Sequence, residues 1–333
     1  MTNEPKKVKL ALLGPGGFGA ERARALHESP LVDFAACYSP IVAERLACQG
    51  EYGAKAGDSR AESWEEPTTE GVVISTPNHT HLGLVRQAAE NGKQVFVEKP
   101  ITPTIAEGRE MIDLCRKAGV LLMVGHNSRR RERVRKMKQL IEDGSLGIPI
   151  AAEMNNSHAG GLDILPGDWR WSAANCPGGP LIQLGIHHAD TLLYLLGPVA
   201  RVSAWQRRLA VQAEIDDTTM TLLEFENGAL GYIGAMYAVP GLRYYHVLGT
   251  QANVRWDRAF GLILERDGSR ETIPAADNDT LREEVDEFAG SIRGSAAPEV
   301  DGEHALQALA IIEAAVLSSL RRRPVEISEV LGK

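Results

Sequence analysis

A lysine and a glycine-rich segment are the parts of this sequence best suited to chemistry. Lys99 follows Glu98 at the end of an apolar run, and Pro100 stops that run. Earlier in the chain, Gly14 and Gly19 belong to a segment with the spacing of a turn that holds a dinucleotide pyrophosphate. An amine and a nucleotide-binding turn within one domain predict redox chemistry on an alcohol or a carbonyl.

The glycine-rich segment lies between an apolar strand-like run and a helical pattern. Gly14 allows the tight turn, Gly16 lets the backbone approach the pyrophosphate, and Gly19 allows the helix to pack closely on the strand. Gly17 and Phe18 stand where the helix begins, and a helix N-terminus attracts phosphate. A turn without a ligand is the alternative, but the strand–turn–helix order favours cofactor binding.

Two further loops follow strand-like runs, at the edge where open α/β sheets bind ligands. Ser39 stands where an acidic residue usually binds the ribose of NAD; a serine does not repel the extra phosphate of NADP, so NAD or NADP fits. Capping of the next helix is an equally good reading of Ser39. No metal-site spacing occurs around His79, so no metal is expected. Further cofactor contacts are expected from Thr76, Pro77, Asn78, His81, Glu98 and Lys99.

Lys99 is the candidate proton carrier. At the end of a buried strand its amine can donate to a substrate oxygen, although a lysine extending to solvent is an equally common reading. A predicted helix in the second half of the chain favours catalysis, because Gln183, His187 and Asp190 share one of its faces. We assign His188 to the core and His187 to the active site.

These motifs together resemble the Gfo/Idh/MocA family, named for glucose–fructose oxidoreductase, inositol dehydrogenase and a rhizopine-catabolism protein. The resemblance covers nearly the whole chain. It implies a Rossmann domain that binds NAD(P), sugar or cyclitol substrates, and Lys99 with His187 as the catalytic pair. Many relatives carry aspartate where this chain has Gln183, so an Asp–His relay is in doubt here. The matching segments are 14–19, 76–78 with His81, 92–100 and 185–190.

Several other polar residues are candidates for binding substrate. Trp169 and Arg170 lie in a polar-aromatic loop, and tryptophans stack on sugar faces, although a surface plug of aromatic residues would look the same. A basic run contains Arg129, which could meet an anionic substrate; Glu132 within the run favours a solvated helix face over a nucleic-acid site. The full set of substrate candidates is Gln183, Trp169, Arg170, His126, Arg129 and Asp190.

The elements that must position these residues form two domains. Strand-like and helical runs alternate over residues 1–126, which predicts a Rossmann NAD(P)-binding domain with a parallel sheet. Long strand-like segments dominate residues 127–333, and an Asn-Gly pair at 227–228 predicts a hairpin. We therefore expect an α/β protein whose C-terminal α+β domain has a large, mostly antiparallel open sheet that binds substrate and mediates oligomerisation.

Length and composition indicate which partners, cellular compartment and oligomeric state to expect. The 333 residues exceed the usual size of one core, and a net charge of −8 disfavours nucleic-acid and anionic-membrane partners. Four cysteines without a paired motif suggest reduced thiols in the cytoplasm, and no segment is expected to span a membrane. One apolar sheet face would be left uncovered in a monomer, which predicts a homodimer or homotetramer.

The sequence therefore predicts an NAD(P)-dependent oxidoreductase that transfers a hydride between nicotinamide and a carbinol or carbonyl of a sugar, sugar derivative or cyclitol. Two alternatives stay open. The first is an NAD-dependent glycosidase that oxidises the sugar transiently, and the second is a non-catalytic, nucleotide-responsive binding protein. The sequence leaves the sugar and the oxidised carbon undetermined.

Overall fold

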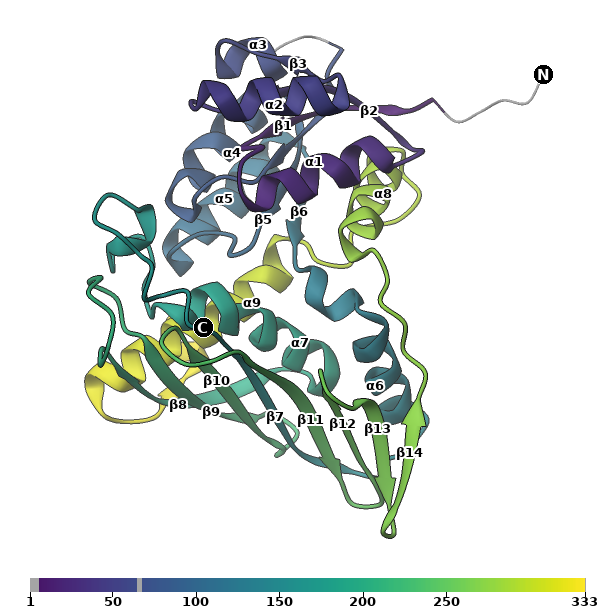
Figure 1. Cartoon of the computed structure of the whole chain (residues 1–333), viewed down its shortest axis with the longest axis vertical. Coiled ribbons are helices and arrows are strands. Elements are labelled where there is room, and N and C mark those ends of the chain that lie inside the picture. The colour runs from purple at the N-terminus through teal and green to yellow at the C-terminus, as the bar shows by residue number, and fades with distance from the viewer. Residues whose placement is uncertain (1–5, 65–67, 333) are drawn as a thin grey trace, which may run out of the picture. The chain divides into compact units, whose positions relative to one another are not determined.

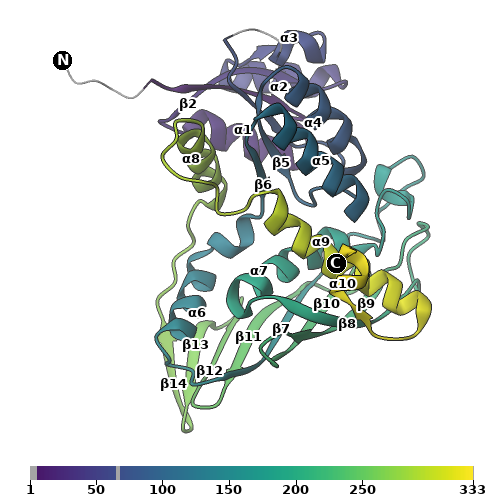
Figure 2. The ribbon, with the colours of Figure 1, turned by 180° about the vertical axis from the view of Figure 1, so that it is seen from behind.

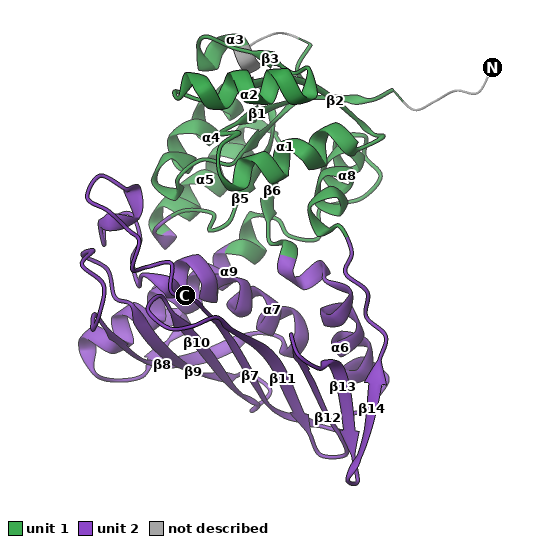
Figure 3. Ribbon diagram, viewed as in Figure 1, with its two compact units in different colours: residues 1–102, 106–127, 279–305 green, residues 103–105, 128–278, 306–333 purple. Residues whose placement is uncertain are grey.

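The computed structural model describes residues 6–64 and 68–332 and divides into two compact units (Figure 3). Unit 1 comprises residues 1–102, 106–127 and 279–305, and unit 2 comprises residues 103–105, 128–278 and 306–333. The sequence places a single boundary at 126 and assigns everything later to the second domain. Residues 279–305 instead belong to unit 1, because Leu281, Val285 and Phe288 are buried in its core.

Unit 1 is built on a six-stranded parallel sheet in the order β3-β2-β1-β4-β5-β6. Its strands are β1 (Val8–Leu13), β2 (Val32–Tyr38), β3 (Lys55–Ala56), β4 (Gly71–Ile74), β5 (Gln94–Glu98) and β6 (Leu122–Gly125). The chain reverses its direction of travel across the sheet between β1 and β4, which is the point where such sheets bind ligands. The predicted Rossmann topology is confirmed.

Helices cover both faces of this sheet (Figures 1 and 2). They are α1 (Phe18–Glu28), α2 (Val42–Tyr52), α3 (Arg60–Trp64), α4 (His81–Glu90), α5 (Ile105–Ala118) and α8 (Thr280–Ile292). Helices α1 and α8 lie on one face, and α4 and α5 lie on the other. The sequence predicts that Phe18, Ala23 and Leu26 of α1 face inward. Ala23 and Leu26 are buried as predicted, but Phe18 is 48% exposed because it begins the helix beside the open glycine turn.

Unit 2 is built on a nine-stranded sheet in the order β14-β13-β12-β11-β7-β10-β9-β8-β15. Its strands are β7 (Pro149–Ser157), β8 (Val199–Arg207), β9 (Thr218–Phe225), β10 (Leu230–Met236), β11 (Leu242–Gly249), β12 (Asn253–Asp257), β13 (Gly261–Arg266), β14 (Ser269–Ile273) and β15 (Val325–Glu326). Strands β7 and β10 pair in parallel and the other neighbours pair antiparallel. The predicted open, mostly antiparallel sheet is confirmed, as is the hairpin of β9 and β10.

The helices of unit 2 lie on one face of its sheet (Figures 1 and 2). They are α6 (Glu132–Glu142), α7 (Ile186–Leu196), the C-terminal part of α9 (Gly302–Arg321) and α10 (Ile327–Leu331). A π-helical turn over Leu181–Gly185 precedes α7, where the sequence predicts one uniform helix. The opposite face of the sheet leaves Trp205, Met220, Leu222 and Leu230 each about half exposed.

One expectation about membranes needs correction. Helix α9 is long and apolar enough, by length and composition, to cross a membrane, whereas the sequence analysis expects no such segment. Within α9, 56% of that apolar window is buried inside the protein. A buried core helix can have the same length and composition as a membrane-spanning helix, so these two properties alone are weak evidence for a membrane span.

Candidate active site

The glycine-rich turn has the close backbone packing that a dinucleotide site requires. Gly14 has a φ of 82°, and a Cβ there would lie 2.5 Å from the Ser75 carbonyl oxygen. A Cβ on Gly19 would lie 1.7 Å from the carbonyl oxygen of Gly14. Gly17 has a φ of 53° and open space beside it at the start of α1. A side chain is therefore excluded at two positions, and the open start of α1 suits a pyrophosphate.

The end of β2 holds a carboxylate that the sequence analysis overlooked. Ser39 is buried; its Oγ donates to Glu44 Oε2 at 2.6 Å and accepts from the backbone N–H of Ile41 at 3.1 Å. A Cβ on Gly16 would lie 2.0 Å from Glu44 Oε1, so this carboxylate sits directly against the glycine turn. An acidic side chain from the first turn of α2 therefore lies beside the glycine turn.

The loop after β4 is held in place by its own side chains. Thr76 and Thr80 share a hydrogen bond of 2.6 Å between their hydroxyls. Within the described residues, the Nδ2 of Asn78 is buried without a hydrogen-bond partner. A buried donor without a partner in this loop fits a polar group of a bound cofactor. Pro77 begins the turn and is half-buried.

The side chain of His81 lies between two loops of unit 1. Its ring is fully buried, with Nε2 at 2.9 Å from the Thr76 carbonyl oxygen and Nδ1 at 3.1 Å from that of Pro100. Burial holds the pKa of His81 below its ordinary value. The imidazole joins the loop after β4 to the loop after β5, and a direct cofactor contact from His81 stays a prediction.

Lys99 is half-buried at the end of β5, and the residue before it anchors that strand end. Arg22 of α1 donates from Nε to Glu98 Oε1 at 3.0 Å and from Nη2 to Glu284 Oε2 at 2.8 Å. All three side chains are buried. Burial alone would lower the pKa of Arg22, but the carboxylates of Glu98 and Glu284 raise it above its ordinary value. Glu98, the residue before Lys99, is thus held by a buried ion pair with Arg22.

His187 lies on α7 in unit 2 and is half-buried. Its Nδ1 is 3.1 Å from the Oγ of Ser128, a neighbour that the sequence analysis did not single out. Asp190, one turn further along α7, is fully buried and pairs with the guanidinium of Arg129 at 2.9 Å and 2.6 Å. This ion pair joins the segment before α6 to α7. A substrate contact for either of its members stays a prediction.

The remaining candidates are spread over both units. Gln183 is buried in the π-helical turn, and His126 is buried at the end of β6 in unit 1. The Arg170 guanidinium lies 4.5 Å from the centre of the Trp169 ring in a short 3-10 turn (Trp169–Trp171). His188 is fully buried, and burial together with Arg243 lowers its pKa to about 3. It is a neutral core residue, as expected.

Two observations bear on other kinds of site. Among the described residues, no group of three or more His, Cys, Asp and Glu side chains could hold a metal ion.

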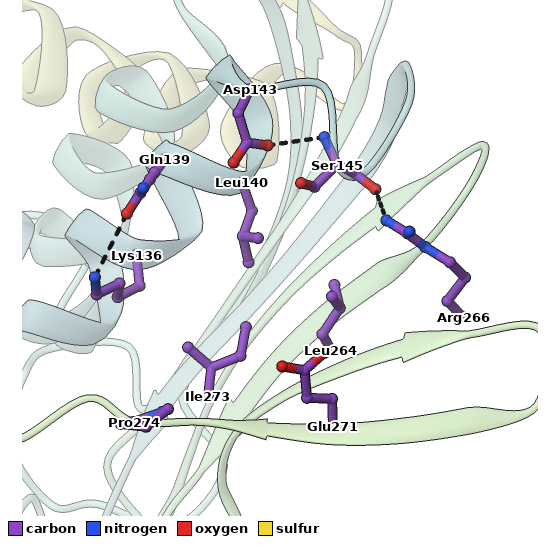
Figure 4. Close-up of a pocket in the computed structure, with 10 residues that line it drawn as sticks. All are labelled: Lys136, Gln139, Leu140, Asp143, Ser145, Leu264, Arg266, Glu271, Ile273 and Pro274. Carbon is purple, nitrogen blue, oxygen red and sulfur yellow. Dashed lines mark hydrogen bonds between the residues drawn. The ribbon is translucent and has the colours of Figure 1, made fainter.

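Unit 2 has an open hollow of about 370 Å³ between α6 and strands β13 and β14 (Figure 4). Lys136 and Arg266 on its wall bond to Gln139 and to the carbonyl oxygen of Ser145. None of the predicted catalytic or cofactor residues lines this hollow.

Comparison with known proteins agrees with both units. Residues 8–126 match the oxidoreductase family with an NAD-binding Rossmann fold, and residues 134–255 match the GFO/IDH/MocA C-terminal domain. A D-xylose 1-dehydrogenase (NADP(+)) from Haloarcula marismortui is 30% identical over 71% of this chain and 69% of its own length. The chain belongs to the GFO/IDH/MocA oxidoreductase family.

Other members of the family match over greater lengths. A myo-inositol 2-dehydrogenase from Thermotoga maritima is 28% identical over 98% of this chain and 100% of its own. The crystal structure of an oxidoreductase from Desulfitobacterium hafniense, provisionally named NADPH-dependent, is 33% identical. It superimposes with a TM-score of 0.94 over 98% of this chain and 99% of its own. The two-unit architecture is thus that of a GFO/IDH/MocA oxidoreductase.

Proposed function

We propose that this oxidoreductase oxidises a secondary alcohol of a sugar, sugar derivative or cyclitol, or reduces the corresponding carbonyl. The observation that carries the proposal is the anchored end of β5, where Arg22 and Glu284 hold Glu98 and leave Lys99 half-exposed beside it. The names of relatives, which include inositol, xylose and apiose dehydrogenases, support a polyhydroxylated substrate.

Each proposed catalytic residue has a defined task. The Lys99 ammonium would donate to the substrate oxygen and carry its proton as the alcohol becomes a carbonyl. His187, with its ring held by Ser128, would hydrogen-bond a hydroxyl of the substrate. Gln183 offers an amide that binds hydroxyls but takes no proton, so no Asp–His relay is assigned. Bound nicotinamide supplies the hydride acceptor or donor.

The test is a panel of sugars and cyclitols, each incubated with NAD or NADP while the absorbance of reduced nicotinamide is followed. Steady accumulation of reduced cofactor with a free sugar supports the proposal. Release of an aglycone from a glycoside, without net reduction of the cofactor, would instead indicate the redox-assisted glycosidase. A cofactor that binds with no turnover across the panel, while its own fluorescence reports saturation, would indicate the non-catalytic alternative.

We further propose that NAD is preferred over NADP, on the basis of Glu44. A carboxylate at the end of β2 accepts hydrogen bonds from ribose hydroxyls and repels a 2′-phosphate. Arg45, the nearest basic residue in sequence, is paired with Asp58 at 2.9 Å. Glu44→Gln is therefore expected to tighten NADPH binding about tenfold relative to NADH, since about 1.4 kcal/mol of repulsion would be removed.

Equilibrium titration of NADH and NADPH fluorescence measures this preference without any turnover. Glu51→Gln on the exposed side of α2 changes the net charge equally and should leave the ratio of the two dissociation constants unchanged. If Glu44→Gln leaves that ratio where it is in the wild type, Glu44 does not set the preference.

We also propose a cytoplasmic homodimer or homotetramer that packs through the exposed sheet face of unit 2. Trp205 pairs directly with Met220 across β8 and β9, and Leu222 pairs with Tyr232 across β9 and β10, so the apolar groups are contiguous. Leu222→Glu would bury a charge in that contact and is expected to give monomers at micromolar concentration. Light scattering measures the mass, and Leu320→Glu at the exposed end of α9 is the control. A wild-type protein that is already monomeric would contradict the proposal.

A further inference from the structure

Unit 2 contains a cluster of three arginines packed around one buried tyrosine. Arg131 is the N-cap residue of α6, Arg133 lies in the first turn of that helix, and Arg243 lies on β11. Arg243 donates to the Tyr245 hydroxyl from Nε at 3.3 Å and from Nη2 at 3.0 Å. The Arg133 guanidinium stacks 3.9 Å from the centre of the Trp256 ring. Two helix positions and one strand therefore bring three positive charges together.

Among the residues that the structure describes, only one of the three positive charges in this cluster has a carboxylate partner. Asp277 accepts from Arg133 at 3.0 Å, but its side chain is 88% exposed. Within the described residues, Nε of Arg131 is buried without a hydrogen-bond partner. Burial, and then repulsion from Arg243, lower the pKa of Arg131 to about 10. Arg131 is half-buried, and a buried donor without a partner on a charged side chain is unfavourable, so an anion that reaches Nε would be stabilised there.

The cluster is connected to the candidate catalytic histidine by short contacts within unit 2. The backbone N–H of Arg131 donates to the carbonyl oxygen of Ser128 at 3.3 Å, and the Ser128 hydroxyl lies 3.1 Å from His187. On the other side, the His188 ring meets the Tyr245 ring edge to face at 5.2 Å. The backbone of Arg131 is thus joined to His187 by two hydrogen bonds that run through Ser128.

Two neighbouring arginines of the same basic segment are bonded to side chains of α7. Arg129 is neutralised by the buried carboxylate of Asp190. Arg135 donates to the Tyr194 hydroxyl at 2.9 Å on the α7 side. Within the cluster, Arg133 pairs with Asp277, whereas neither Arg131 nor Arg243 forms an ion pair with a carboxylate of the described residues.

We propose that Arg131 and Arg243 bind an anionic substituent of the substrate, a carboxylate or a phosphate, so that the preferred substrate is an acidic sugar derivative rather than a neutral sugar. This inference rests on the proposed function and narrows its substrate class. A guanidinium offers paired donors that match both carboxylate and phosphate oxygens, whereas a neutral hydroxyl leaves the positive charge unbalanced.

Calorimetric titration of the full chain with D-glucose, D-glucuronate, D-glucose 6-phosphate and inorganic phosphate tests the proposal. An acidic probe should bind at least about tenfold more tightly than D-glucose, and the two acidic sugars distinguish carboxylate from phosphate. Arg131→Gln and Arg243→Gln should each weaken binding of the acidic probe about tenfold or more and leave D-glucose unaffected. Arg258→Gln, in the exposed turn after β12, removes the same charge and should change nothing.

Arg243→Lys keeps the charge and serves as a check on folding, with partial retention of binding expected. Equal binding of acidic and neutral probes, or acidic binding that survives both glutamine variants, would overturn the inference. Reduction of NAD or NADP is followed separately. Turnover of neutral sugars without any acid preference would leave the oxidoreductase proposal standing and remove only this inference. If an acidic probe binds in an arginine-dependent way but no sugar is turned over, this inference stands and the oxidoreductase proposal fails.

Discussion

Lys99→Ala is expected to lower turnover by about two to four orders of magnitude, because positioned proton transfer contributes this much to such reactions. The affinity for the cofactor should change little, since the phosphates are expected to bind the turn at 14–19 and the start of α1. Steady-state rates with a verified substrate and NADH titration by fluorescence measure the two effects separately.

Lys117→Ala provides the matched control for this variant. Lys117 is an exposed lysine in the last turn of α5 in the same unit, so its loss removes the same charge. Its turnover should equal that of the wild type. A Lys99→Ala protein that keeps most of its rate would show that Lys99 is not the proton carrier.

Arg22→Ala is expected to lower the free energy of unfolding by about 3–5 kcal/mol, because it leaves two buried carboxylates without their cation. Arg22 also donates to the carbonyl oxygen of Leu281 at 3.1 Å and lies 4.6 Å from the centre of the Phe96 ring. Its contacts join α1, β5 and α8 inside unit 1. Chemical denaturation followed by far-UV circular dichroism gives the free energy directly.

Arg24→Ala on the same helix is the control. Arg24 pairs with Glu28 and Asp279 near the surface, so its loss should cost less than about 1 kcal/mol. Arg22→Met combined with Glu98→Gln and Glu284→Gln should recover much of the lost stability, since no buried charge is then left unpaired. Equal losses for Arg22→Ala and Arg24→Ala would contradict the role assigned to the buried network.

Several strands and helices of unit 1 were predictable from the sequence because their signals are local, whereas β3 and α3 were not predicted and α8 was assigned to the second domain. The bounds of β1, β5 and α4 agree with those expected from apolar runs and the residues that end them. The glycine turn was predictable for the same reason, since its spacing and its position between a strand and a helix depend on few residues. Lys99 was a candidate from its place at a strand end and His187 from its helix face, and the family resemblance then implied that they form a catalytic pair; their roles stay proposals.

The tertiary structure alone decided which side chains meet across long distances in sequence. Arg22 and Glu284 are separated by 262 residues, and nothing in either local pattern predicts their ion pair. The basic segment before α6 gives no sign that Arg129 is neutralised by Asp190 while Arg131 is not. Periodicity fixes which face of an element is buried, whereas the partner of a buried charge depends on how separate elements pack. The sequence by itself therefore determined the fold class of the two domains and the glycine-rich turn. Packing determined that residues 279–305 join unit 1 and which buried charged groups have an ion-pair partner.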